Sequence, residues 1–457
     1  MRWTLTDPAN GNRDSGRLLS LDALRGITML LLIPDISGGF SFYKMTQRFP
    51  DDPLWSFLSR TFTHSQWSGC TLWDLIMPLF IFMVGVSMPY SYAARCKRQD
   101  TPAMLLTHAV ERSFTLLSLG MILLLPLHVP LDLMAPLLLL TSGLPIESLW
   151  TRMAPASASR GHLVERLWRW GVLLACGTYL WLNFRHIGQL TLHGVLPQIA
   201  LGYVFAFLLV NRVRTVQVTA VTVILVGYWL AFLLYPLPPP GFDPATVGVA
   251  PGDEVFTGFF AHWNKNTNLA ADFDVWLLNL LPRSEPFVFS VHGYQTLNFI
   301  PTMPTMILGI MTGEYLRRDR SRHELRNGLV IAGGLAILGG LLAGWLLCPI
   351  VKSIWTPSWV LFSGGCALLA LAALYHLIDV RGWRGWSLPL VVAGMNPILL
   401  YVLAYDYRWW VVEAWGRTLG PWLFASTVAP VIESVIFLAS MWVLAFLLHR
   451  LRIYIRI

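Results

Sequence analysis

Charged residues are scarce in this chain. Of its 457 residues, 13% are Asp, Glu, Lys or Arg, whereas 55% are hydrophobic. Soluble domains usually carry about 25% charged residues, so the deficit argues against a soluble protein. The net charge of +8 comes mostly from short connectors between apolar runs. That distribution argues against a nucleic-acid partner, which needs a clustered basic surface.

Cysteine is also sparse. The chain has five cysteines, an odd number, and no two of them form a Cys-x-x-Cys pair. Most lie in or beside apolar runs, so the sequence predicts neither a disulfide framework nor a zinc site. We therefore expect no bound metal.

Long apolar runs dominate what is present. A helix needs roughly 20 apolar residues to cross a bilayer, and the mean hydropathy is +0.57. The 21 Trp suit the two membrane–water interfaces. The runs lie at 21–40, 74–94, 108–127, 131–148, 166–184, 194–211, 216–235, 294–316, 327–347, 357–378, 388–406 and 426–449. The sequence predicts an all-α, polytopic transmembrane bundle over residues 1–457, with about 12 helices, or 11 if the pair at 108–148 is irregular.

The distribution of Lys and Arg sets the orientation. With the N-terminus inside, the inner connectors hold more than twice as many cations as the outer ones, which is the usual bias of cytoplasmic loops. We expect both termini in the cytoplasm. Two long segments, 41–73 and 236–293, then lie outside. The second is rich in Trp, Asn and Asp, and so it either faces a sugar or caps the bundle as a solvated loop.

Two outer residues have the chemistry of a catalytic pair. Asp35 follows Pro34 at the end of the first predicted helix, where the proline frees backbone carbonyls. His64 lies in a short polar loop, and histidine is the usual general base near neutral pH. We expect a carboxylate such as Asp35 to fix the tautomer of His64. Solvated side chains are the alternative for both residues.

Other polar residues at membrane depth are candidates because their burial in lipid is costly. Asp22 and Arg25, three residues apart, are spaced to form an ion pair. Asp74 stands three residues after Thr71, and this spacing predicts a helix cap rather than a catalytic acid. The same group also includes Gln198, Glu314, His376, Asn396, Asp406 and Glu433.

Several segments together resemble one known family. They are Ser20–Gly26 after Arg17, His64 with Trp67, Gly69 and Asp74, Gly194–Ala200, Pro301–Met306, Lys352–Ser358, Asp379 with Gly382, and Gly394–Asn396. In this order they resemble the heparan-α-glucosaminide N-acetyltransferase family. The opening Leu21–Gly26 motif also occurs in another membrane acyltransferase family, but the histidine which that family carries late in the first helix is replaced here by Asp35.

The resemblance extends to bacterial relatives of this family and implies a multi-pass acetyltransferase of the bacterial inner membrane. Such an enzyme moves an acetyl group from cytosolic acetyl-CoA to an amino sugar outside. The family's functional histidine falls on His64, as general base or acetyl carrier, and a family asparagine falls on Asp35. Arg25, Gln198 and Asn396 are then the expected contacts of acetyl-CoA. The expected contacts of the acceptor are Trp67, Asp74, Lys352 and Trp355. Residues 294–298 depart from the family pattern and leave the acceptor open.

Competing interpretations remain. Many helices with internal carboxylates also suit a secondary transporter of a small polar or sugar substrate, which would need neither His64 nor acetyl-CoA. A homologue that only binds its ligand is another possibility. The expected partners are acetyl-CoA, an amino sugar or glycan, membrane lipid and a second copy of the chain in a homodimer, with no nucleic acid.

Overall fold

The computed structural model describes residues 18–37, 39–124, 191–280 and 285–454, together with Gly171 and Arg283. Within these ranges the regular secondary structure is helical, apart from one isolated antiparallel bridge between Ser68 and Val351. The all-α prediction is therefore confirmed for the part of the chain that is described. Two of the predicted membrane segments, 131–148 and 166–184, lie outside it.

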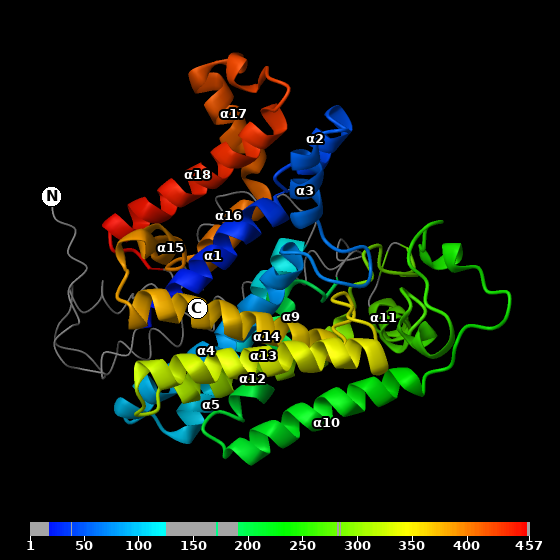
Figure 1. Cartoon of the computed structure of the whole chain (residues 1–457), viewed down its shortest axis with the longest axis horizontal. Helices are drawn as coiled ribbons and strands as arrows, with labels where there is room; N and C mark the ends of the chain where they lie inside the picture. Colours follow the sequence, from blue (N-terminus) through cyan, green and yellow to red (C-terminus); the bar gives the residue numbers. More distant parts are fainter. Residues whose placement is uncertain are drawn as a thin grey trace.

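Helices follow most of the predicted apolar runs (Figure 1). The longer ones are α1 (Leu19–Ile36), α4 (Ile76–Lys97), α5 (Pro102–Leu124), α9 (Val195–Phe207), α10 (Arg214–Leu233), α12 (Phe299–Leu316), α13 (Arg322–Leu346), α14 (Pro357–Leu374) and α18 (Ala429–Arg450). The shorter ones are α2 (Phe42–Arg48), α3 (Pro53–Thr61), α11 (Leu269–Asn279), α15 (Leu388–Ala393), α16 (Pro397–Asp406) and α17 (Arg408–Leu419). Single turns include the 3₁₀ segments η2 (Trp73–Leu75), η4 (Pro244–Val247) and η5 (Gly258–Trp263), and the π-helical η7 (Tyr375–Val380).

Five helical segments among the described residues are long and apolar enough to cross a membrane. They are Trp73–Lys97, Arg214–Leu233, Arg322–Leu346, Pro357–Val380 and Ala429–Arg450. A sixth arises if α15 and α16, which bend by 60° at their junction, form one broken span. The chain is thus a multi-pass membrane protein, while the total of about 12 helices and the side on which each terminus lies stay predictions.

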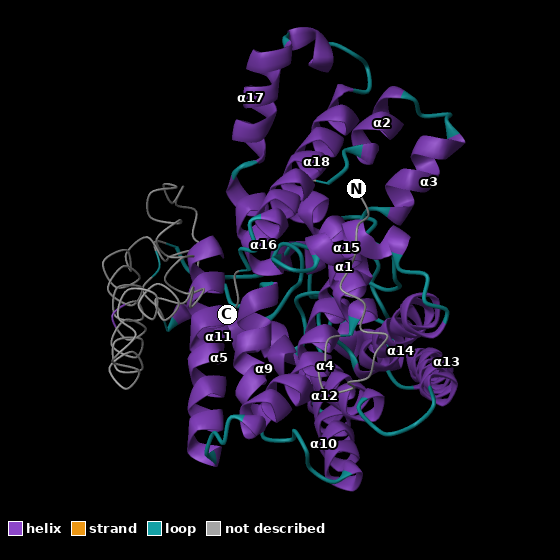
Figure 2. Cartoon of the chain, turned by 90° about the vertical axis from the view of Figure 1, so that its left-hand side faces the viewer, coloured by secondary structure: helices purple, strands orange, loops and turns teal. Residues whose placement is uncertain are grey.

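Close backbone contacts hold α1 and α4 in place. In Figure 2 α4 lies beside α12, and α1 lies beside α15. A Cβ at Gly26 of α1 would meet the carbonyl oxygen of Leu390 at 1.7 Å, and one at Gly85 of α4 would meet that of Met306 at 2.0 Å. Only glycine allows backbones to approach this closely. The helix that carries Asp35, α1, and the helix that follows the His64 loop, α4, therefore have fixed neighbours.

The described part of segment 236–293, which the sequence predicts to lie outside, is a folded cap. It contains η4, η5 and α11, and its Trp263 is buried in a small core with Trp67 and Val351. Asn268 caps α11 by accepting hydrogen bonds from Ala270 N and Ala271 N. The buried polar residues of this segment thus stabilise the cap itself, as expected if the segment caps the bundle.

Candidate functional site

The loop that carries His64 joins α3 to η2 and is tied to two distant segments. Gly69 N donates to Ile350 O at 2.9 Å, next to the Ser68–Val351 bridge. The indole Nε1 of Trp67 donates to Trp263 O at 3.0 Å. The loop is therefore held against the α13–α14 connection on one side and the cap formed by segment 236–293 on the other.

Asp74 organises this loop from its buried position at the start of the α4 span. Its Oδ2 accepts hydrogen bonds from Thr71 N at 3.0 Å and Ser65 N at 3.1 Å. The side chain of Asp74 is 1% exposed. The predicted capping contact with Thr71 is present, and the same carboxylate also faces His64.

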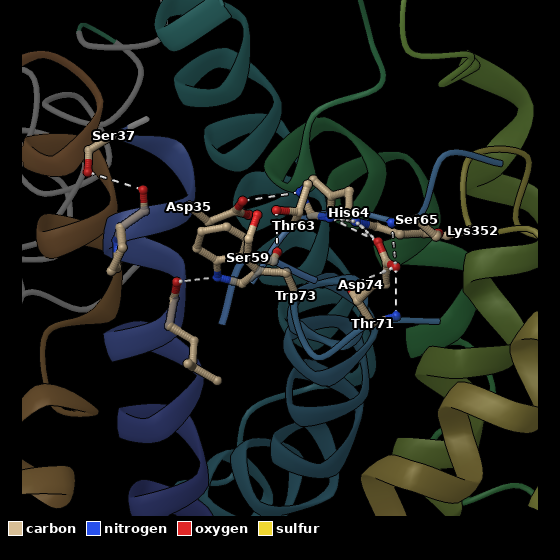
Figure 3. A network of polar contacts seen from close by, with 12 residues as sticks. Asp35, Ser37, Ser59, Thr63, His64, Ser65, Thr71, Trp73, Asp74 and Lys352 are labelled. Carbon is tan, nitrogen blue, oxygen red and sulfur yellow. Dashed lines mark hydrogen bonds and ion pairs between the residues drawn. The ribbon is translucent and has the colours of Figure 1, made fainter. Parts of the chain in front are cut away.

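His64 has partners on both ring nitrogens (Figure 3). Nδ1 lies 2.9 Å from Asp74 Oδ1 and 3.2 Å from Lys352 Nζ. Nε2 lies 3.1 Å from Asp35 Oδ1. Lys352 Nζ also lies 3.3 Å from Asp74 Oδ1. The four side chains form one cluster of two carboxylates, an ammonium and an imidazole, which we call the His64 cluster.

Asp35 reaches the cluster from the last turn of α1. Pro34 leaves that turn without one backbone donor, and side chains from elsewhere hold it. Trp73 Nε1 donates to Leu31 O at 3.2 Å. Arg408, at the start of α17, donates to the carbonyls of Ser37 and Gly39 just beyond the helix end. The carboxylate of Asp35 is thereby aimed at His64.

Lys352 enters the cluster from a tight turn. Trp355 N donates to Lys352 O at 3.0 Å, and Trp355 has a φ of 50°. This left-handed conformation is unusual for a bulky residue and concentrates at functional sites. The ammonium of Lys352 also lies 5.5 Å from the ring centroid of Tyr294, within range of a cation–π contact.

The electrostatics of the cluster favour positive charge on both bases. Burial lowers the pKa of His64, but hydrogen bonds to Asp35 and Asp74 outweigh it, so the pKa is raised above its ordinary value. Burial likewise lowers the pKa of Lys352, while Tyr294 and Asp74 raise it, again with a net upward shift. An imidazole in this setting is a strong base beside a buried counter-charge.

The two sides of the cluster differ in exposure. The side chains of Asp74 and Lys352 are 1% and 6% exposed, whereas those of Asp35 and His64 are 19% and 38% exposed. Asp74 and Lys352 therefore contact His64 on the side of its ring that faces the protein interior. The edge that bears Nε2 and Asp35 is the one that a substrate can reach.

The three residues expected at acetyl-CoA lie apart from this cluster in the contact network. Arg25 pairs with Asp22 at 3.2 Å and donates to Ser87 Oγ. Gln198 is fully buried, and its Nε2 donates to the carbonyl of Leu192 at 2.8 Å. Their roles, and that of Asn396, stay predictions.

Asn396 and the two expected aromatic contacts are buried. Asn396 Nδ2 donates to Ile453 O at 3.1 Å. Trp67 packs under Gly293, and Trp355 packs on Trp359 with its Nε1 3.3 Å from Thr305 Oγ1. Both indoles therefore shape the site as framework, and a direct contact with an acceptor stays a prediction.

Two residues at the site escaped the sequence analysis. The sequence marked Tyr294 only as part of the departure at 294–298, and it gave no indication of a role for Arg408. Neither has a local signal, because Tyr294 meets Lys352, and Arg408 meets the end of α1, only through the tertiary fold. Over the described ranges, no group of three or more His, Cys, Asp and Glu side chains is arranged to hold a metal ion.

Comparisons with known proteins agree with the motifs. The chain is 24% identical over 424 residues to heparan-alpha-glucosaminide N-acetyltransferase of Homo sapiens, and 25% identical over 410 residues to the protein of that name in Mus musculus. These matches cover 87% and 86% of this chain but 55% and 54% of the relatives, so it spans about half their length. No family model matches the chain. On its ordered motifs and these two relatives, the chain resembles the heparan-α-glucosaminide N-acetyltransferase family.

Proposed function

We propose that this chain is an acetyl-CoA-dependent transmembrane acetyltransferase. It transfers an acetyl group from cytosolic acetyl-CoA to an amino sugar, or a glycan ending in one, on the outer side of the membrane. The names of the two relatives supply the reaction class. The observation that carries the proposal is the His64 cluster, an imidazole held between two carboxylates with one edge exposed.

The cluster suits acyl transfer because an attacking amine must lose a proton. For this role the imidazole proton must lie on Nδ1, which faces Asp74 at 2.9 Å, so that the lone pair is on Nε2. Nε2 then acts as general base toward the acceptor. The second route is attack by Nε2 on the thioester, followed by transfer from acetyl-His64 to the acceptor.

Acid is expected to suppress the reaction by either route. Nε2 must be unprotonated, and the pKa of His64 is raised above 6.5. The rate at low substrate should therefore fall as pH drops through a value above 6.5, and not through the ordinary histidine range. If the rate instead fell as pH dropped through 6.5 or a lower value, His64 would not be the titrating group.

The test is release of CoA from acetyl-CoA by purified protein in nanodiscs, with glucosamine and a panel of amino sugars. We expect acceptor-dependent release, reduced by roughly 10²–10⁴-fold in His64→Ala, the range for loss of a general base. His262→Ala is the matched control, because His262 belongs to the outer cap and contacts Tyr235 O instead of the cluster. Absence of release with every acceptor would refute the proposal and favour a transporter or binding protein.

A further inference from the structure

Five buried side-chain oxygens have no hydrogen-bond partner among the residues that the structure describes. They are Gln198 Oε1, Asp274 Oδ1, Gln295 Oε1, Thr296 Oγ1 and Asn298 Oδ1. Each of these residues is at most 3% exposed. Buried polar atoms are almost always hydrogen-bonded, so a group of unpartnered oxygens indicates a ligand.

These residues belong to one network around the 3₁₀ turn η6 (Thr296–Asn298). Thr296 N donates to Asp274 Oδ2 at 2.9 Å. Gln198 Nε2 lies 3.2 Å from Thr296 O and 3.4 Å from Gln295 O. The network therefore joins α9 to α11 of the cap through η6.

The amide nitrogens determine which way the amide oxygens point. Gln198 Nε2 donates to backbone carbonyls, including Leu192 O at 2.8 Å. Asn298 Nδ2 donates to Ser353 O at 2.7 Å. A carbonyl oxygen can only accept, so the NH₂ group must lie on that side of each amide. The two amide oxygens therefore point away from these carbonyls and remain acceptors without a donor.

The unpartnered atoms are a carboxylate oxygen, three amide oxygens and a hydroxyl oxygen, which are the ligands that hard cations prefer. A water molecule donates only two hydrogen bonds, and it leaves the buried carboxylate without a counter-charge. Asp274 carries the one negative charge among the five groups. That charge matches a monovalent ion, whereas a divalent ion would leave a buried surplus of positive charge.

We propose that Asp274 Oδ1 and neutral oxygens of this network bind an alkali-metal cation, Na⁺ or K⁺. Thr296 Oγ1 is the neutral ligand with the strongest support, because Thr296 N already contacts the same carboxylate. The inference goes beyond the proposed function and does not depend on it. It also differs from the expectation of no bound metal, which rested on the cysteines.

The cation would stabilise the segments that hold Lys352. Asn298 donates to the carbonyl of Ser353, the residue that follows Lys352. Tyr294, whose ring centroid lies 5.5 Å from Lys352 Nζ, directly precedes Gln295. The site is therefore structural, and it lies beside the His64 cluster without contributing a group to it.

The test is equilibrium unfolding of the full-length protein in mixed micelles at pH 7, with NaCl or KCl exchanged against choline chloride at constant ionic strength. Burial raises the pKa of Asp274 to about 6, so the carboxylate is mostly ionised at this pH. For one ion that binds only the folded state, each tenfold rise above its dissociation constant raises the folding equilibrium constant about tenfold. We expect this dependence in the wild type.

Three variants locate the site. Asp274→Asn keeps an acceptor for Thr296 N, so it should fold, exceed the wild type in stability in choline chloride, and lose the dependence on Na⁺ and K⁺. Thr296→Val removes one neutral ligand and should shift the dependence to higher ion concentration. Asp272→Asn is the matched control, because Asp272 lies on the same helix and contacts Tyr235, and it should keep the wild-type dependence.

Wild-type stability that depends on neither Na⁺ nor K⁺ overturns the inference and leaves water as the occupant. A dependence that survives in Asp274→Asn also overturns it, because the ions then act elsewhere. Stronger Asp274-dependent stabilisation by Ca²⁺ than by Na⁺ at equal concentration would refute the assignment to a monovalent ion. Each readout is stability, so absence of CoA release would refute the acetyltransferase and leave this inference unchanged.

Discussion

Replacing Lys352 by Met tests whether the buried half of the cluster is a true ion pair. Lys352 and Asp74 are 6% and 1% exposed, with their charged atoms 3.3 Å apart. Methionine fills a similar volume but carries no charge. The variant therefore leaves the Asp74 carboxylate buried beside His64 without its ammonium partner.

The expected cost follows from the burial. Removing one member of a buried pair typically destabilises a protein by about 3–5 kcal/mol, because the remaining charge is uncompensated. Asp74 keeps the N–H groups of Thr71 and Ser65 and the imidazole of His64. Because Asp74 keeps these partners, we expect Lys352→Met to lower the free energy of unfolding by about 3 kcal/mol, near the lower end of that range. The double variant Lys352→Met/Asp74→Asn removes both charges and should recover at least half of the loss.

The assay is equilibrium unfolding in mixed micelles, with wild type, both single variants and the double variant compared as a cycle. A second readout is the pH profile of CoA release. The Lys352 charge lowers the pKa of His64, so the acidic limb should move to higher pH in Lys352→Met. A loss below about 0.5 kcal/mol, the size of a neutral surface change, or a double variant no more stable than Lys352→Met, would refute the buried-pair argument.

Two further outcomes are expected, both in stability. Burial raises the pKa of Asp274 to about 6, so the folded state holds this proton more tightly than the unfolded state, and stability should fall as pH rises from about 4 to about 6. Asp274→Asn retains an acceptor for Thr296 N and should therefore stabilise the protein at pH 7 by up to about 3 kcal/mol. Unfolding at pH 4 should show no such gain. A gain that is the same at both pH values would contradict the protonation of Asp274 as its cause. Gly26→Ala places a Cβ against the carbonyl of Leu390 and should cost about 1–3 kcal/mol, whereas Gly227→Ala, with open space around it, should cost little in the same assay.

The sequence predicted well those features that depend on local patterns. The apolar runs at 74–94 and 327–347 correspond to α4 and α13 because a lipid-exposed helix must be apolar along its whole length. The spacing of three residues between Thr71 and Asp74 predicted the contact between them. The suggestion that a carboxylate such as Asp35 lies beside His64 agrees with the 3.1 Å contact, while its catalytic role stays a proposal.

Features that depend on distant segments were not predictable from one sequence. Lys352 was expected near the acceptor because of a motif, but its contact with His64 crosses 288 positions of the chain. That contact arises because Ser68 in the His64 loop forms an antiparallel bridge with Val351, the residue before Lys352. The burial of Trp355 behind this turn likewise follows from the tertiary packing. No local periodicity encodes either result.

The end of α1 has a mechanical consequence. Pro34 removes one backbone hydrogen bond immediately before Asp35, so the position of the last turn depends on contacts from neighbouring segments as well as on its own helix. Trp73 of η2 and Arg408 of α17 provide those contacts, and they are 335 positions apart in the chain. The aim of the Asp35 carboxylate is therefore adjustable by changes in η2 or α17, without altering any residue of the His64 cluster.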